Sequence, residues 1–337
     1  MPRHRRPLSE LLTVGAFTTA EARSAGIDPR RLSAPEATRL SRGVYASLRG
    51  DVTEHEIVRA YQRSTPDAVA CRNTAARLLG LPLPLGTLDW SLENRRFLVH
   101  LSYGSTHRHS SGRLRWSQLD LGPEEIITED GVRVTSRPRT LLDLAGNSAS
   151  FSVDDLVVIG DHLVRVPRRR FENRTEPFAT IEELRQLSAR HAGRGARRLR
   201  RALELVVIGS DSPAETRLRL AILRAGLPAP QVNVRIFDGT SDLGQPDLSW
   251  PEWMVCIEHE GPHHRTPQQH EKDIERGERR RDHGWIELQT TARDLRDTAA
   301  RGVRRAEEKL RQHGWPDAAR LGVDHSGELP TEESRRR

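Results

Sequence analysis

Residues 245 to 264 read Gln245-Pro-Asp-Leu-Ser-Trp-Pro-Glu-Trp-Met-Val-Cys-Ile-Glu-His-Glu-Gly-Pro-His-His264, and this stretch joins short apolar runs to acidic side chains. Residues 254–257 are consecutively apolar, a pattern typical of a strand buried on both faces. Glu258 follows directly, and a carboxylate at the end of such a strand is costly to desolvate unless it has a partner or a cation. The stretch therefore predicts a buried strand that ends in a polar site.

A second apolar run, residues 248–250, follows Asp247 and is separated from the first by the turn signal Pro251-Glu252. These features predict a hairpin that brings Asp247 near Glu258. Carboxylate oxygens favour a hard divalent cation, so we expect these two acids to hold Mg²⁺. Mn²⁺ is the alternative cofactor, because His264 close by could add a nitrogen ligand.

The order Pro246-Asp247, then Glu258-His259-Glu260, resembles the PD-(D/E)XK nucleases, with Glu260 where their pattern has lysine. The closer resemblance is to the very-short-patch-repair (Vsr) endonucleases and their bacterial relatives. Further matches are Ser212-Pro-Ala-Glu-Thr216, Gly226-Leu-Pro228, Gly261, His263, His264, Gln269, Asp273, Arg276 and Gly284-Trp285. The likeness covers roughly residues 210–295, within an expected nuclease domain over 210–300. It implies a restriction-endonuclease-like core and hydrolysis of phosphodiester bonds.

The resemblance also assigns roles to residues. It implies that Asp247, Glu258, Glu260 and His264 are catalytic, and that Asp247, Glu258 and Glu215 are metal ligands. Glu215 has a structural alternative, because Ser212 as N-cap and Glu215 three residues later form a capping-box pattern. Glu260 either joins the metal ligands or marks an inactive site, since a third acid raises the local repulsion. His263 or His264 could protonate a leaving group, and one of the two is expected to be a plain loop residue.

The same segment predicts an order of elements. A helix begins at Ser212 and ends at Gly226. A strand over 232–237, a loop over 238–244, the hairpin, a helix over 268–283 and a strand over 285–288 follow it. We expect a C-terminal helix and a disordered tail within 301–337.

Residues 1–50 predict short helices and one strand. Thr18 and Glu21 have capping-box spacing, and Asp28-Pro29 predicts another helix start. Residues 42–46, Arg-Gly-Val-Tyr-Ala, resemble the strand of the winged helix-turn-helix in AbiEi-type antitoxins. This resemblance implies DNA binding, and the expected contacts are Arg30, Arg31, Arg39 and Arg42. The alternative is a solvated face on a module that binds a protein, such as a toxin.

Residues 51–150 resemble the middle region found with AbiEi-type N-termini. The sequence predicts helices over 73–80 and after Val134, and a strand over 97–101. Thr74, Arg139, Thr140 and Asp143 could be functional there, although helix caps and a buried ion pair explain them as well. Residues 151–209 predict a basic helical connector, with a capping-box pattern at Thr180 and Glu183 and a helix after Gly195. Its Arg197 and Arg198 either follow a DNA backbone or form a solvated face.

Composition bounds the class of protein. The 337 residues suffice for two or three domains, and the net charge of +7 comes almost entirely from arginine. Arginine suits phosphate, although a genomic preference for its codons is an equal explanation. Two cysteines without a CxxC motif argue against zinc and disulfides and favour the reducing cytoplasm. Neither a membrane span nor a signal-peptide core is expected.

The sequence therefore predicts an α/β protein, α+β overall, with a winged helix, a mixed middle region and a nuclease-like core. The predicted function is that of a metal-dependent DNA endonuclease. The alternative is an AbiEi-like antitoxin or transcriptional regulator whose nuclease fold is inactive. RNA as the nucleic-acid partner remains open, because a phosphate-binding face has the same sequence pattern for both.

Overall fold

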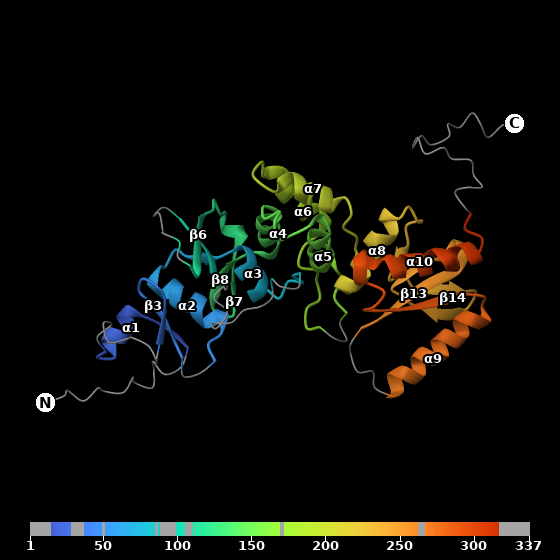
Figure 1. The fold of residues 1–337 in the computed structure, drawn as a ribbon, viewed down its shortest axis with the longest axis horizontal. Coiled ribbons are helices and arrows are strands. Elements are labelled where there is room, and N and C mark those ends of the chain that lie inside the picture. The colour runs from blue at the N-terminus through green and yellow to red at the C-terminus, as the bar shows by residue number, and fades with distance from the viewer. Residues whose placement is uncertain are drawn as a thin grey trace. The chain divides into compact units, whose positions relative to one another are not determined.

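The computed structural model describes residues 15–27, 37–48, 51–84, 87, 99–104, 110, 112–168, 172–261 and 267–316, which form a mixed α/β protein (Figure 1). The chain divides into two units, Met1–Ile208 (unit 1) and Gly209–Arg337 (unit 2). The helices described in unit 1 are α1 (Thr19–Ser24), α2 (Glu54–Ser64), α3 (Arg72–Leu78), α4 (Arg137–Ala145), α5 (Val153–Val164), α6 (Ile181–Arg190) and α7 (Ala196–Leu203). Its strands are β1 (Ala16–Thr18), β2 (Ala37–Ser41), β3 (Val44–Ser47), β4 (Val69–Ala70), β5 (Val99–Tyr103), β6 (Leu114–Gln118), β7 (Ile126–Glu129) and β8 (Val132–Thr135).

The first part of unit 1 is a three-stranded antiparallel sheet in the order β1-β3-β2. The predicted capping box before α1 is present, with Thr18 Oγ1 accepting from Glu21 N at 3.2 Å. The predicted strand over 43–46 is β3, whereas β1 and β2 were not predicted from local pattern. The helices predicted before Val14 and from Pro29 fall outside the described residues, as do Arg30 and Arg31.

A five-stranded mixed sheet in the order β6-β5-β4-β8-β7 follows in unit 1. Strands β5 and β6 are parallel, and β4 is parallel to β8. Helices α3 and α4 confirm the two predicted helices of this region. The predicted strand at 97–101 is described from Val99 and extends to Tyr103.

Within residues 151–208, helix α7 packs against α5 and α6, and all three helices pack against α4 in unit 1. The N-terminus of α6 carries the predicted capping box between Thr180 and Glu183, and α7 follows Gly195 as expected. Helix α5 is strongly apolar, and its Leu156 and Ile159 are fully buried. This apolar helix shows that the segment contributes to the core as well as carrying basic side chains.

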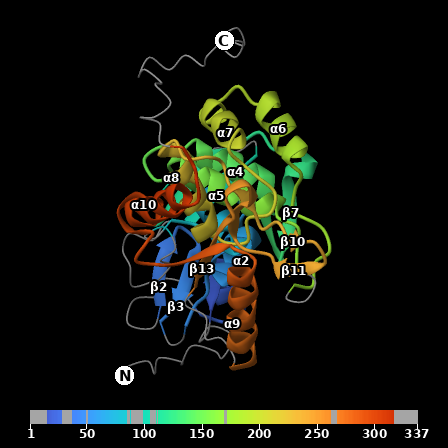
Figure 2. The ribbon, with the colours of Figure 1, turned by 90° about the vertical axis from the view of Figure 1, so that its right-hand side faces the viewer.

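Unit 2 is built on a four-stranded mixed sheet in the order β14-β13-β12-β9. Its described elements are α8 (Pro213–Arg224), β9 (Gln231–Val232), β10 (Ile236–Asp238), β11 (Ser241–Gly244), β12 (Leu248–Trp250), β13 (Val255–Glu260), α9 (Pro267–Asp282), β14 (Ile286–Thr291) and α10 (Arg296–Gln312). Figures 1 and 2 show α8 and α10 together on one side of the sheet and α9 on the other. One apolar core joins α8, α10 and the strands, and the indole of Trp250 within it donates to Pro228 O at 2.8 Å.

The predicted hairpin is present as β12 and β13, and α9 and β14 confirm the predicted helix and last strand within a few residues. The single strand predicted over 232–237 was wrong. Asn233 has φ +48 and breaks the strand into β9 and β10, which belong to different sheets. The loop predicted over 238–244 was wrong too, because β11 pairs with β10 across a turn at Gly239.

Both cysteines are buried thiols, and burial raises the pKa of Cys256 to about 12. Neither thiol is therefore poised to act as a nucleophile. In the described part of the chain, no helix has the length and apolar character needed to cross a bilayer.

Candidate active site

The β12–β13 hairpin separates an apolar face of the unit 2 sheet from a polar one. Leu248 pairs with Ile257, and both side chains enter the apolar core. Asp247 precedes that pair by one residue and Glu258 follows it by one. Because side chains alternate along a strand, both acids lie on the opposite face, toward α9. Glu260, two residues beyond Glu258, lies on that same face.

Asp247 is held at the end of β13 by main-chain contacts. Its Oδ2 accepts a hydrogen bond from the backbone N–H of His259 at 2.6 Å. Its carbonyl oxygen accepts from the backbone N–H of Asn233 at 3.0 Å. The hairpin thus brings Asp247 beside the residue that follows Glu258, as the turn signal predicted.

Glu258 is bound by a buried arginine that the sequence reasoning missed. Arg280, on α9, has a fully buried side chain, and its Nη1 donates to Glu258 Oε1 at 2.8 Å and to Glu287 Oε2 at 2.6 Å. Its Nε donates to the carbonyl of Leu243 at 2.8 Å. Burial raises the pKa of the Glu258 carboxyl, and Arg280 offsets part of that effect. Arg280 therefore neutralises charge where a cation was expected.

Glu260 lines a cavity of about 600 Å³ at the edge formed by β14 and α9. Asp273 of α9 and Glu287 of β14 line the same cavity, together with the cations Arg281 and Lys309. Lys309 comes from α10 and was not singled out by sequence, although it is one of the two lysines in the chain. The cavity thus places a lysine from a distant element among the acids near Glu260.

Glu215, at the N-terminus of α8, is linked to the hairpin through Asn233. Its backbone N–H donates to Ser212 Oγ at 3.2 Å, so half of the predicted capping box is present. Its carboxylate instead accepts from Asp211 N at 2.9 Å and from Asn233 Nδ2 at 2.7 Å. Asn233 therefore connects Glu215 to the main chain of Asp247. Burial raises the pKa of Glu215.

The described residues contain no group of three or more His, Cys, Asp and Glu side chains arranged to hold a metal ion. His263 and His264 lie outside the described residues, so their predicted roles are not placed. The acids brought together on the polar face are Asp247, Glu258 and Glu260. Their carboxylate oxygens suit Mg²⁺ in type, and further ligands would have to complete its coordination.

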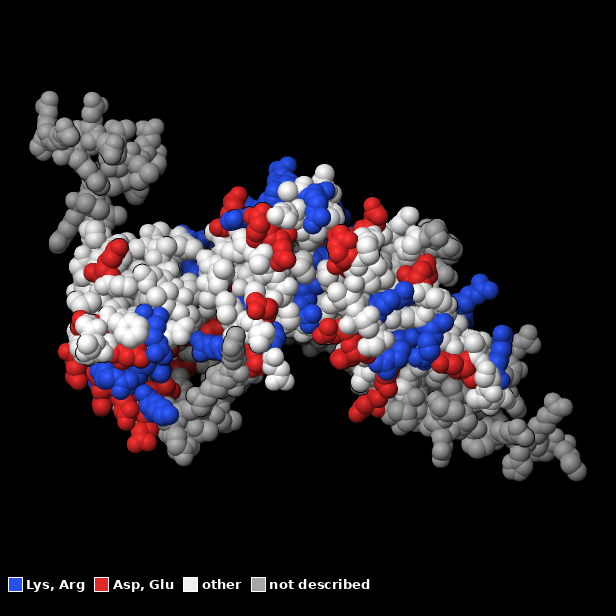
Figure 3. Space-filling view, turned by 180° about the vertical axis from the view of Figure 1, so that it is seen from behind, with Lys and Arg blue, Asp and Glu red and all other residues white. Residues whose placement is uncertain are grey.

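Helix α9 presents both signs of charge to solvent. Figure 3 shows Lys and Arg side chains interspersed with Asp and Glu side chains over this helix, at the lower left. The residues 271–282 alternate the two signs in the same way. A mixed surface attracts a phosphate backbone less than a basic one does. Helix α9 therefore contributes to the site through buried Arg280, and its exposed face is not a basic nucleic-acid-binding surface.

The candidate DNA contacts of unit 1 divide into exposed and structural arginines. Arg39 lies on β2 and Arg42 in the following turn, and both are exposed. Arg197 is exposed on α7. Arg198 has main-chain partners: it donates to the carbonyl of Ala145 at 2.7 Å and to that of Phe151. Its guanidinium thus satisfies carbonyls that follow the end of α4.

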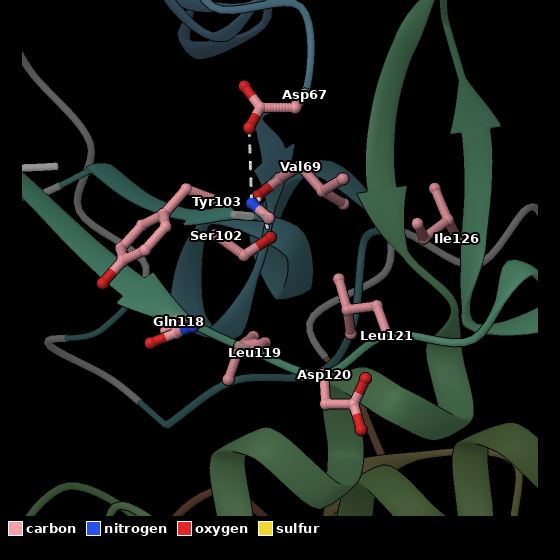
Figure 4. A pocket seen from close by; sticks show the side chains of 10 residues that line it. Asp67, Val69, Ser102, Tyr103, Gln118, Leu119, Asp120, Leu121 and Ile126 are labelled. Atoms are coloured by element: carbon pink, nitrogen blue, oxygen red, sulfur yellow. Dashed lines mark hydrogen bonds between the residues drawn. The ribbon is translucent and has the colours of Figure 1, made fainter. Parts of the chain in front are cut away.

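A second concave surface lies in unit 1, at the carboxyl ends of the parallel strands β5 and β6. The cavity of about 670 Å³ is lined by ten residues that include Ser102, Tyr103 and Gln118. Figure 4 shows Asp67 at one end and Asp120 at the other, with Asp67 Oδ2 accepting from Gly104 N at 3.4 Å. Among the described residues, this lining has two carboxylates and neither lysine nor arginine, which disfavours a phosphate ligand.

Comparison with known proteins gives a distant similarity. No family model matches the chain. The uncharacterised proteins MT2308 and Rv2248, from Mycobacterium tuberculosis strains CDC 1551 and H37Rv, are each 25% identical to it over 258 residues. The matched region is 72% of this chain and 81% of each relative. The chain is thus similar to these mycobacterial proteins over most of its length.

Proposed function

We propose that unit 2 is a metal-dependent DNA endonuclease with a Vsr-like, restriction-endonuclease-like core. The observation that carries the proposal is the position of Asp247, Glu258 and Glu260 on one polar face of the buried β12–β13 hairpin. Apolar packing on the other face of the hairpin fixes its register. Acids held by a rigid hairpin are what a hydrolytic metal site requires.

In this proposal Asp247 and Glu258 would hold Mg²⁺ or Mn²⁺, which supplies an activated water and neutralises charge that develops on the phosphate. Glu258 accepts from Arg280 through Oε1, and the same guanidinium binds Glu287. Arg280 would therefore hold the carboxylates of Glu258 and Glu287 close together when both are ionised. The half-buried Lys309 lines the cavity of Glu260 and could offset that acid as a phosphate approaches.

We further propose that the N-terminal segment is a winged helix that binds DNA. The sheet β1-β3-β2 and helix α1 support this, and exposed Arg39 and Arg42 lie at the β2–β3 hairpin. Phosphate contacts from such arginines position a protein on a duplex without reading sequence. Removal of residues 1–50 should therefore lower DNA affinity more than the cleavage rate.

The test is cleavage of plasmid, linear and mismatched DNA by the full chain in Mg²⁺, Mn²⁺ or EDTA. We expect cutting only with a divalent ion, and loss of cutting in Asp247→Asn, which keeps the side-chain shape but removes its charge. Glu252→Gln, in the exposed turn between β12 and β13, is the matched control and should cut normally. Undiminished cutting by Asp247→Asn would refute the assignment.

A second candidate is a DNA-binding, AbiEi-like antitoxin or regulator with an inactive nuclease fold. The observation that favours it is Arg280, a permanent cation already bonded to Glu258. Glu260→Lys separates the two candidates. If Glu260 is a metal ligand, the change should weaken Mn²⁺ binding and cleavage. In a retired nuclease it should leave metal binding unchanged or raise activity. Calorimetric Mn²⁺ titration beside the cleavage assay measures both.

A further inference from the structure

A cavity of about 250 Å³ in unit 1 gathers cationic side chains around a buried acid. It lies between α3, α4 and the segment that joins α6 to α7. Its lining includes Arg72, Arg139, Arg194, His191 and Asp143. With ionised Asp143 set against three guanidinium groups, the lining has an excess of positive charge.

Asp143 is buried and only half satisfied. Its side chain is 7% exposed, and its Oδ1 accepts from Arg139 Nε at 3.0 Å. Its Oδ2 is also buried and has no hydrogen-bond partner among the described residues. Burial raises the pKa of this carboxyl, and Arg139 and Arg72 offset part of the effect. A buried oxygen in this state requires a donor, which a ligand or a water must supply.

Arg72 has the complementary unpaired group, a buried hydrogen-bond donor. Its Nε is buried and has no acceptor within the described part of the chain. Arg72 also has φ +53, a costly conformation for a residue with a side chain, at the first position of α3. The cavity thus contains a buried donor without an acceptor and a buried acceptor without a donor.

The remaining wall is held close to α4 by a glycine. Gly195 has φ +99, and a Cβ there would lie 2.4 Å from Gly146 N and 2.5 Å from Ala145 C. Only glycine allows this approach, which sets His191 and the exposed Arg194 beside the cavity. The site is therefore a packed structural feature and not a gap between loose segments.

We propose that this cavity binds a sugar phosphomonoester. Phosphate oxygens would accept from Arg72 Nε and from the Arg194 guanidinium, and a sugar hydroxyl would donate to Asp143 Oδ2. An anion without a hydroxyl would leave Asp143 Oδ2 without a donor, and the two negative charges would repel each other. The cavity volume of about 250 Å³ is larger than a lone phosphate needs.

The ligand chemistry has two sources, a free sugar phosphate and the 5′-terminal sugar phosphate of an RNA strand, whose 2′-hydroxyl remains free. Neither source requires the acids of unit 2, so the proposal stands apart from the nuclease assignment. Asp247→Asn should leave binding at this cavity unchanged.

The test is calorimetric titration of the full chain with ribose 5-phosphate, sulfate and ribose. We expect ribose 5-phosphate to bind more tightly than sulfate, which has no hydroxyl to donate, and ribose not to bind. Arg194→Ala should weaken both anions roughly tenfold or more, because a charge-assisted contact is lost. Arg201→Ala is the matched control, since Arg201 is exposed nearby on α7 but does not line the cavity.

Asp143→Asn gives a signature that a structural role would not produce. It should weaken ribose 5-phosphate while leaving or strengthening sulfate, since it removes a negative charge beside the anion. Competition with a 5′-phosphorylated oligoribonucleotide then separates the sources. Displacement by that strand and not by its unphosphorylated form identifies the strand end, whereas no displacement identifies the free sugar phosphate. No binding at millimolar ligand, or equal effects of Arg194→Ala and Arg201→Ala, would overturn the proposal.

Discussion

Two buried arginines, one in each unit, have nearly the same set of partners. Arg139 in unit 1 binds Glu125, Asp143 and the carbonyl of Asp120. Arg280 in unit 2 binds Glu258, Glu287 and the carbonyl of Leu243. In each case one guanidinium bridges two carboxylates and satisfies one main-chain acceptor.

The surroundings of these two clusters differ in charge. Arg72, Arg194 and His191 line the cavity beside Asp143, whereas Glu260 and Asp273 line the cavity beside Glu287 together with Arg281 and Lys309. The cationic surplus around the unit 1 cluster favours an anionic ligand there. The unit 2 cavity carries both signs of charge in its lining.

The largest expected effect is that of removing a central arginine. Arg280→Met should destabilise unit 2 by about 3–5 kcal/mol, because it leaves two buried carboxylates without their cation. Chemical denaturation with Mg²⁺ or EDTA measures the loss. If Asp247 and Glu258 can hold a divalent ion, Mg²⁺ should restore part of the lost stability. Arg139→Met is the control, since Mg²⁺ should not rescue a cluster with surplus cations.

The next largest expected effect is a difference in how acid changes the stability of the two units. Burial and nearby arginines lower the pKa of His100 in unit 1 to about 4 from 6.5. The neutral imidazole of His100 contributes fully to the free energy of unfolding when the pH is above the pKa that His100 has in the unfolded chain. This contribution is lost as pH falls from about 6.5 toward 4, at an order-of-magnitude cost of about 3 kcal/mol. Glu258 in unit 2 acts in the opposite direction: because its folded pKa is raised, protonation favours the folded state as pH falls.

His100→Phe tests this difference in pH dependence. The variant should lose less stability than the wild type between pH 7 and pH 4, measured by denaturation followed separately in each unit. Equal acid sensitivity of the two proteins would show that His100 is not the titrating group.

Local sequence predicted the elements whose signals are local. The capping boxes at Thr18 and Thr180 were confirmed, because each depends on residues three positions apart. The β12–β13 hairpin was confirmed because an apolar run on each side of Pro251 leaves one sensible pairing. The division of 232–244 into three strands was missed, although Asp238-Gly239 is a hairpin signal.

The central arginines show what sequence could not supply. Residues 278–282 of α9 are Glu-Arg-Arg-Arg-Asp, and each is polar enough to be read as solvated. Only the packing of α9 against the sheet determines that Arg280 is buried while Arg279 and Arg281 are exposed. The site acids could be predicted from sequence because they follow an apolar run, whereas Arg280, which binds Glu258, could not.

The smallest expected effect concerns two adjacent arginines of α7 that sequence treats alike. Arg198 donates to the carbonyls of Ala145 and Phe151, as Arg139 and Arg280 do to theirs, whereas Arg197 is exposed. Arg198→Ala should therefore cost about 1–3 kcal/mol by leaving acceptors unsatisfied, and Arg197→Ala should change stability by less than about 0.5 kcal/mol.

For DNA binding we expect the reverse, with the larger effect from Arg197→Ala. If Arg197 contacts phosphate, its removal should lower the salt dependence of affinity by about one unit of slope, uniformly across sequences. Thermal denaturation and salt titration of both variants measure the two effects. A stability loss in Arg197→Ala equal to that in Arg198→Ala would show that main-chain partners do not distinguish structural arginines from binding ones.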